Sequence, residues 1–218
     1  TGTGAHRLGV GLRRPHPAFP LTDRSVDEMV SLVQEVTTRA GLVRYVGDGT
    51  GPAVVLLHAT LHDHHDFDAV LAGFAASFRT LAPDWPGHGS SPLPAEPPVT
   101  ATLLGEVLTD FLDALALPRV VLIGSSVGGY AAARVAIERP DRVAGLVLVN
   151  SGGCFTPPTR RARAAIRLLG TAPIARRLLP RIIGQYLRPR TSFERELGDR
   201  VSERARSSAG SALAEDLD

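Results

Sequence analysis

The sequence predicts an α/β fold built on a doubly wound, mostly parallel sheet. Short apolar runs alternate along the chain with segments whose apolar residues recur at helical spacing. The run at residues 53–57 is apolar on both faces, which is typical of a strand in the middle of a parallel sheet covered by helices. A glycine-serine turn at residues 124–129 joins another such run directly to an alanine-rich segment. Strands and helices that alternate in this way predict right-handed crossovers and helices on both faces of one sheet.

Composition indicates one domain with a substantial core, because 44% of the 218 residues are hydrophobic and the formal net charge is only +2. All 24 basic residues are arginines scattered among carboxylates, which is not the pattern of a nucleic-acid-binding surface. The single cysteine, Cys154, excludes an internal disulfide and is expected to be a small buried hydrophobe. No apolar run approaches the roughly 20 residues of a membrane span. We therefore expect a cytoplasmic protein with a small-molecule substrate and no nucleic-acid or membrane partner; its oligomeric state stays open.

The N-terminal part carries two predictions. Residues 1–25 are rich in Gly, Arg, Pro and His without any period and predict a mobile arm. Since the only methionine is Met29, residues 1–28 are expected to be an extended or mis-started end. The core is then predicted over residues 26–153, beginning with a short helix at Asp27–Val36.

The remaining core elements are read from apolar period and turn residues. Strands are predicted at residues 41–46, 53–57, 79–82, 120–123 and 143–149, the last of them buried. Helices are predicted from Phe67 to Phe74, from Leu103 to Leu115 and from the alanine-rich segment to Pro140.

The turn Gly124-Ser125-Ser126-Val127-Gly128-Gly129 is the strongest functional signal in the chain. Between a strand and a helix, a G-x-S-x-G pattern is typical of a nucleophile elbow. A turn that tight strains the backbone of the serine and leaves no room for side chains two positions either side of it. Ser126 is therefore the candidate nucleophile, at the positive end of the following helix dipole.

With three further motifs, this turn resembles the α/β-hydrolase superfamily of esterases, lipases and epoxide hydrolases. The motifs are Leu56-Leu57-His58-Ala59-Thr60, Asp84-Trp85-Pro86-Gly87-His88-Gly89-Ser90-Ser91 and Arg139-Pro140-Asp141-Arg142-Val143. The resemblance covers about residues 40–155. It implies a serine hydrolase of small apolar esters or related carbonyl compounds that forms an acyl-enzyme and needs no cofactor.

The resemblance also assigns the oxyanion donors. By position they are the backbone N–H groups of Val127 and Thr60, although this chain has Ala59 where the family usually has glycine. Because residue 126 is serine and not aspartate, the branches with a carboxylate nucleophile, such as dehalogenases and epoxide hydrolases, are disfavoured.

The general base is the missing part. The superfamily order is serine, acid, histidine, yet all seven histidines lie between His6 and His88. Residues 154–218 instead predict short helices of a cap. Nine arginines and no acid between residues 159 and 190 predict a solvated face or, as an alternative, a surface for an anionic membrane or substrate. The sequence therefore predicts a hydrolase without its last strands: an excerpt, a truncated product or a pseudoenzyme.

Three alternatives remain open. His58, Asp84 and His88 are possible pocket or supporting residues, and either histidine could replace the missing base. His62, His64 and Asp66 partly imitate the H-x-H-x-D-H motif of metal-dependent hydrolases, but Phe67 stands where that motif has its last histidine. A chain with Ser126 and no base also suits a non-catalytic protein that binds small molecules.

Overall fold

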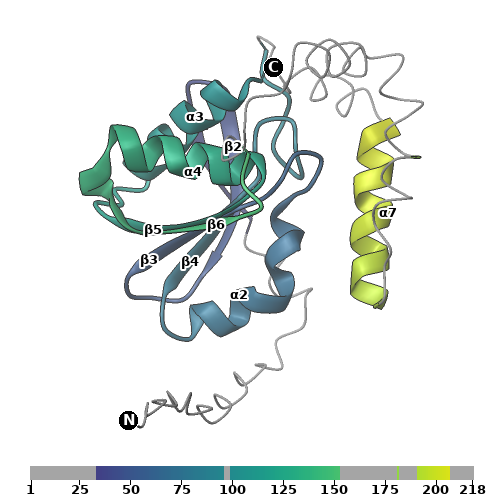
Figure 1. The fold of residues 1–218 in the computed structure, drawn as a ribbon, viewed down its shortest axis with the longest axis horizontal. Helices are drawn as coiled ribbons and strands as arrows, with labels where there is room; N and C mark the ends of the chain where they lie inside the picture. The colour runs from purple at the N-terminus through teal and green to yellow at the C-terminus, as the bar shows by residue number, and fades with distance from the viewer. Residues whose placement is uncertain (1–32, 96–98, 153–180, 182–190, 207–218) are drawn as a thin grey trace, which may run out of the picture.

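A computed structural model describes residues 33–95, 99–152, 181 and 191–206, and its centre is a six-stranded sheet (Figure 1). The spatial order is β1-β2-β4-β3-β5-β6. The strands are β1 (Gln34–Thr38), β2 (Gly41–Asp48), β3 (Ala53–Leu57), β4 (Arg79–Pro83), β5 (Val120–Ser125) and β6 (Val143–Val149). Strands β3, β4, β5 and β6 are mutually parallel. Strand β2 pairs antiparallel with β4 on one side and with β1 on the other. The predicted mostly parallel sheet is confirmed.

Helices cover both faces of this sheet, as a doubly wound fold requires. The helices α3 (Ala101–Ala114) and α4 (Val127–Glu138) pack on one face, and α2 (Asp68–Ala75) packs on the other (Figure 1). Apolar residues at helical spacing on α3, including Leu104, Leu108 and Phe111, are buried against the larger of the two cores. Thr100 caps this helix by accepting a hydrogen bond from the amide of Leu103 at 3.1 Å.

The all-apolar run at 53–57 is the fully buried strand β3, which lies between β4 and β5. The register places Leu57 beside Gly124, so β3 and β5 end at the same edge of the sheet. The loops that follow parallel strands therefore meet there, which is where such sheets place their binding sites.

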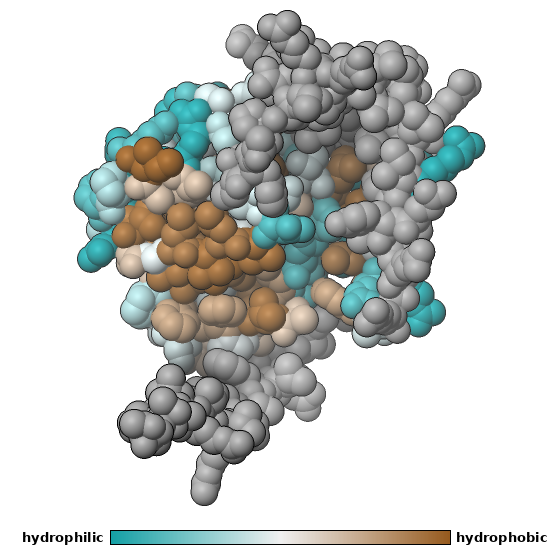
Figure 2. All heavy atoms as spheres, viewed as in Figure 1, coloured by the Kyte–Doolittle hydropathy of each residue, from teal (hydrophilic) through white to brown (hydrophobic). Residues whose placement is uncertain are grey.

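Two predicted elements differ in the structure. Residues 34–36 were expected in a helix but form part of β1, because Val36 pairs with Val43 across a tight turn at residues 39–40. Gly41, which follows that turn, has φ 99°. Strand β6 was expected to be buried, yet Leu146, Val147, Leu148 and Val149 are 38–50% exposed. Within the described sheet β6 has a neighbour only on its β5 side, and Figure 2 shows an apolar patch over this region.

The predicted cap region is described only in part. Residues 192–206 form the amphipathic helix α7 (Ser192–Arg206), which stands beside the sheet in Figure 1. The predicted N-terminal arm, residues 27–32, Cys154 and the rest of the predicted cap except Arg181 and Thr191 lie outside the described residues. In the described part of the chain, no helix combines the length and apolar character needed to cross a bilayer.

Candidate active site

Ser126 occupies the sharp turn between β5 and α4. Its backbone has φ 51° and ψ −116°, a conformation that costs a non-glycine residue free energy. The space around it explains the two glycines of the motif. A Cβ on Gly124 would lie 2.5 Å from the carbonyl carbon of Gly128, and a Cβ on Gly128 would lie 2.5 Å from the carbonyl oxygen of Leu57. Strand, turn and helix are thus packed backbone against backbone.

Hydrogen bonds fix this turn from both ends. The Ser126 amide donates to the carbonyl of Val149 on β6 at 3.1 Å. The Ser126 carbonyl accepts from the amides of Tyr130 at 3.1 Å and Gly152 at 2.9 Å. Val127 is the first residue of α4, so its amide has no acceptor within the helix and carries part of the positive end of the helix dipole.

The loop after β3 begins directly beside this turn. The missing Cβ of Gly128 would also lie 2.7 Å from the carbonyl oxygen of His58, which shows how closely the two segments approach. From Ala59 the chain turns back, with the His62 amide donating to the Ala59 carbonyl at 3.1 Å. Thr60 lies within this turn, and Leu61 takes a left-handed backbone with φ 68°.

His58 is completely buried and both of its ring nitrogens are engaged. Its Nδ1 lies 2.8 Å from the carbonyl oxygen of Ala59, and its Nε2 accepts from the Trp85 amide at 3.0 Å. The ring is therefore neutral, with its proton on Nδ1. Burial lowers the pKa of His58, in agreement with a neutral ring. His58 has no lone pair left for a serine hydroxyl.

Asp84 is fully buried at the end of β4 and joins three segments. Its carboxylate accepts from the backbone amide and from Nδ1 of His64, at 2.8 and 2.9 Å, and from the amide and hydroxyl of Ser90, each at 2.8 Å. Burial alone would raise the pKa of Asp84, but the hydrogen bonds and charge of His64 outweigh it and hold that pKa far below its usual range. The ionised Asp84 carboxylate thus connects the end of β4 to the loop that carries His64 and to the loop that carries Ser90.

His88 is buried in its own turn. Its Nδ1 lies 3.1 Å from the carbonyl oxygen of Pro86, and its ring is 5.2 Å from that of His58. Its Nε2 is buried without a hydrogen-bond partner among the described residues. Burial lowers the pKa of His88 well below the usual value, so this imidazole is neutral.

The histidines of the proposed metal motif are turned apart. Nδ1 of His62 lies 2.8 Å from the Asp66 carboxylate, whereas His64 faces Asp84. Among the described residues, no three histidine, cysteine, aspartate or glutamate side chains converge to hold a metal ion. The geometry of this loop gives the metal alternative no support.

Within the described part of the chain, the hydroxyl of Ser126 makes no hydrogen bond to an imidazole. The residues that the site brings together are the elbow, the turn carrying Thr60, and the buried His58, His64 and Asp84. An open cavity of about 420 Å³ lies between the loop after β4 and α7. Its lining residues, which include none of the elbow or of the 59–63 turn, are Gly87, Gly89, Ser91, Leu93, Arg200, Glu203 and Arg204.

A family model described as alpha/beta hydrolase fold matches residues 52–172, more than half of the chain. The chain belongs to the α/β-hydrolase fold family. The matched region includes the elbow, the 59–63 turn and the loop after β4.

Relatives of this α/β-hydrolase carry several activities in their names. Haloalkane dehalogenase 2 of Mycobacterium tuberculosis is 32% identical over 142 residues, which are 65% of this chain and 49% of that protein. A 2-hydroxy-6-oxononadienedioate/2-hydroxy-6-oxononatrienedioate hydrolase of Burkholderia vietnamiensis is 34% identical over 140 residues, 60% of this chain and 46% of that protein. The chain spans about half the length of these curated relatives. The structure of a thermophilic esterase from Thermogutta terrifontis superposes with a TM-score of 0.68 at 26% identity, covering 84% of this chain and 70% of that one.

Sequence reasoning missed two contacts of this α/β-hydrolase site. The His64–Asp84 pair had a usable signal, because both residues follow neighbouring strands whose ends meet at one edge. Arg204 on α7, which donates to the Asp63 carboxylate at 2.8 Å, had none. It lies 141 residues away along the chain, and nothing local separates it from the other arginines.

Proposed function

We propose that this α/β-hydrolase is a serine hydrolase of small apolar esters or related carbonyl compounds. The observation that carries the proposal is the strained backbone of Ser126 between two glycines that no other residue could replace without a clash. Strain of this kind persists only where surrounding structure enforces it, and it concentrates at active sites. Here it presents the Ser126 side chain at the edge where β3 and β5 end.

In the proposed reaction the Ser126 oxygen attacks the carbonyl carbon, and the hydroxyl proton passes to a general base that the described residues do not provide. The amides of Val127 and Thr60 donate to the oxyanion that forms. Collapse of this intermediate breaks the bond to the leaving alcohol, which takes up the proton, and leaves an acyl-serine. Water then attacks the acyl carbon by the same sequence and releases the acid. No step requires a cofactor.

The identity of the nucleophile favours carbonyl substrates over haloalkanes. A serine oxygen that displaced a halide from a saturated carbon would form an ether, which water does not hydrolyse. Attack on a carbonyl forms an ester, which the oxyanion site would help water to open. Of the two activities named above for relatives, the hydrolysis of an oxo compound therefore suits a chain with Ser126 better than the removal of a halide does.

The buried histidines have structural contacts that limit their part in this chemistry. His58 has both nitrogens occupied, and His64 is held by Asp84. His88 retains one unpartnered nitrogen but is buried within its turn. We assign these residues to the support of the site. For residues 154–218, of which α7 is a described part, we propose the role of a helical cap.

A second candidate function is the binding of small molecules without turnover. It is favoured by the absence, among the described residues, of an imidazole hydrogen-bonded to Ser126. The elbow and the oxyanion donors would then hold a carbonyl or carboxylate group without breaking a bond.

Covalent labelling separates the two functions. The purified chain is treated with a fluorophosphonate, the modified peptide is located by mass, and turnover of a nitrophenyl ester is measured alongside. We expect labelling of Ser126 with turnover, and neither in Ser126→Ala. A folded chain that binds nitrophenyl carboxylates but neither labels nor turns over would show that the binding function is correct.

A further inference from the structure

The turn that carries Thr60 is strained and needs external support. Leu61, its next residue, has φ 68°, a backbone conformation that a leucine adopts only at a cost in free energy. Within the turn, one backbone hydrogen bond, from the His62 amide to Ala59, closes the chain. The direction of the Thr60 amide therefore depends on what holds Leu61, His62 and Asp63 in place.

One support comes from the sheet. Asp84 accepts from the backbone amide and the ring of His64, which fixes the C-terminal end of the turn to β4. The amide of His65 donates to the Asp63 carboxylate at 3.0 Å, so Asp63 caps the short helix η1 (His64–Phe67). Two further contacts hold the ends of the turn: Nδ1 of His58 donates to the Ala59 carbonyl, and Nδ1 of His62 lies 2.8 Å from the Asp66 carboxylate. None of these contacts reaches the carbonyl groups of Leu61 and His62.

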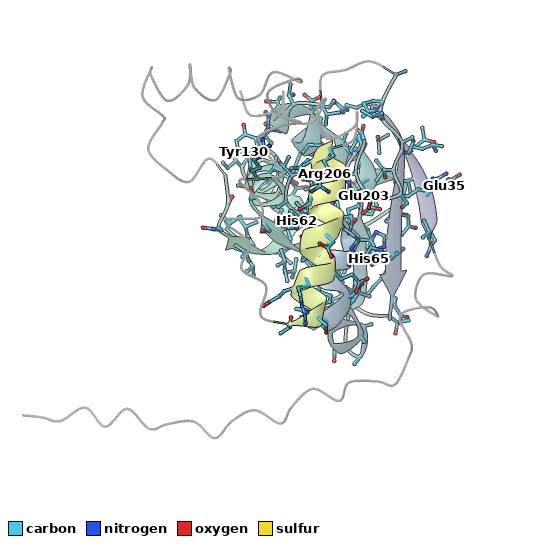
Figure 3. The ribbon with its side chains drawn as sticks, turned by 90° about the vertical axis from the view of Figure 1, so that its right-hand side faces the viewer. Glu35, His62, His65, Tyr130, Glu203 and Arg206 are labelled. Atoms are coloured by element: carbon cyan, nitrogen blue, oxygen red, sulfur yellow. The ribbon has the colours of Figure 1, made fainter. Side chains whose placement is uncertain are left out.

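The second support comes from α7 and consists of one side chain, that of Arg204. The guanidinium of Arg204 donates to the carbonyl of Leu61 at 3.1 Å, to the carbonyl of His62, and to the Asp63 carboxylate at 2.8 Å. Figure 3 views the molecule with α7 foremost and His62 next to it. Three acceptors from three successive residues thus converge on one planar fork, a geometry that arginine matches and lysine does not.

Burial makes this contact strong. Val201 and Ala205, one helical turn apart on α7, enclose the side chain of Leu61; all three are at most 8% exposed. The side chains of Arg204 and Asp63 are 16% and 6% exposed. Burial alone would raise the pKa of Asp63, but the hydrogen bond and charge of Arg204 outweigh it and lower that pKa, so the pair is ionised. Removing the guanidinium would leave the carbonyl groups of Leu61 and His62 without this donor, and would take away the charged partner of the buried Asp63 carboxylate, which would keep the hydrogen bond from the His65 amide.

We propose that Arg204 is a positioning residue, which holds the 60–63 turn in the geometry that directs the Thr60 amide at the oxyanion. This inference rests on the proposed function, because the oxyanion is formed only if Ser126 attacks a carbonyl. It assigns α7 a part in the chemistry beyond that of a cover: the helix anchors the turn of one oxyanion donor through contacts with residues 141 to 143 positions away in the sequence.

The test compares Arg204→Ala and Arg204→Lys with Arg206→Ala, an exposed arginine on the same helix. Two quantities are measured on the full chain: amide hydrogen exchange of peptides covering residues 59–66, and the Ser126 labelling rate with a fluorophosphonate together with kcat and KM for a nitrophenyl ester. We expect Arg204→Ala to speed exchange of the turn at least tenfold and to lower labelling and kcat by 10- to 100-fold, with KM changed less than threefold. Loss of a whole oxyanion donor sets the upper limit at about 10²–10³.

Rescue distinguishes positioning from a general loss of structure. Methylguanidinium added to Arg204→Ala should restore a large part of the labelling rate, Arg204→Lys should fall between the alanine variant and the wild type, and Arg206→Ala should stay within twofold of the wild type. A folded Arg204→Ala that labels within twofold of the wild-type rate overturns the inference. If the wild type itself neither labels nor turns over, the proposed function fails, and unchanged exchange in Arg204→Ala would then show that Arg204 does not anchor the turn.

Discussion

At the scale of single residues, the elbow depends on glycines, because a side chain at Gly124 or Gly128 would collide with neighbouring backbone. A strained backbone such as that of Ser126 costs on the order of 1–3 kcal/mol. It is held here by close contacts between backbone segments, which are possible only because the residues in contact are glycines. Carbonyl groups of Leu57 and His58 stand where a Cβ of Gly128 would be. The neighbouring atoms are backbone and cannot rotate away, so the geometry of the site depends on these positions directly.

Gly128→Ala tests this dependence. The added methyl group would lie 2.5 Å from the Leu57 carbonyl, so we expect the free energy of unfolding to fall by about 1–3 kcal/mol or more and Ser126 labelling to be lost. Gly145→Ala is the matched control, because its Cβ would meet Val121 methyl groups at an ordinary 3.6 Å. Urea denaturation and fluorophosphonate labelling of both variants measure the difference; equal behaviour would contradict the packing argument.

The buried histidines predict a pH dependence whose sign follows from their pKa values. Burial lowers the pKa values of His58 and His88, so between those lowered values and about 6.5 the unfolded chain binds protons that the folded chain does not. Stability must then fall as pH drops below 6.5, by up to about 1.4 kcal/mol per pH unit for each such group. His88→Gln should flatten this fall, as measured by urea denaturation between pH 5 and 7.

His65 provides a variant of opposite sign. Its hydrogen bond to Asp68 raises the pKa of His65, so its contribution is complete below about pH 6.5 and is lost as pH rises through the raised value. Removing it in His65→Asn takes away stability on the acidic side, so the fall in stability should be steeper between the raised pKa and about pH 6.5 and unchanged from there to pH 5. A flattening in this variant would show that the signs are assigned wrongly.

At the scale of elements, β6 is the strand whose surroundings differ most from those of its neighbours. Its residues form the same apolar pattern as β3, yet four of them are 38–50% exposed while β3 is fully buried. An exposed apolar strand with an open edge favours pairing with another chain. Among the described elements, β6 is therefore where we expect self-association to begin.

Val147→Lys tests that expectation. A lysine on β6 should reduce self-association, because charged side chains on an edge strand oppose pairing with another chain. Val70→Lys on α2 is a closely matched control, because Val70 is 45% exposed and Val147 is 46% exposed. Sedimentation velocity at several concentrations should show less dimer and aggregate for Val147→Lys only. An equal decrease in both variants would indicate a general effect of charge.

At the scale of the whole molecule, the spacing of apolar residues in the sequence predicted most helices and strands. The edge of the sheet at which parallel strands end predicted where the site lies. The apolar run of β3 and the spacing of Leu104, Leu108 and Phe111 report burial directly, so their structure followed from sequence. Residues 34–36 did not, because pairing with β2 overrode a weak helical pattern. The contact of Arg204 with the 61–63 turn depends on where α7 docks, which no local pattern encodes.

Asp84 connects the scales, because one carboxylate joins β4 to both loops at the edge of the sheet. The Asp84 carboxylate accepts four hydrogen bonds. In Asp84→Asn one carboxylate oxygen becomes an NH₂ group, which donates and would face the donors that the oxygen now accepts from. Leaving buried donors without their acceptor costs about 1–3 kcal/mol for each group, and more where a charged group is involved. We expect Asp84→Asn to lose most of the stability of the chain, measured by urea denaturation at pH 7. Asp113→Asn, on an aspartate whose side chain is 51% exposed, should change it by less than about 1 kcal/mol.

The pH dependence of the same variant identifies the mechanism. Because the folded pKa of Asp84 is depressed, its contribution is present above the unfolded value of about 3.9 and is lost as pH falls through the folded value. The wild type should therefore lose stability steeply below about pH 4, and Asp84→Asn should lose less over the same range, since asparagine does not titrate. If the variant kept the full acid dependence, other carboxylates would carry the acid sensitivity, and Asp84 would hold the loops by hydrogen-bond geometry alone.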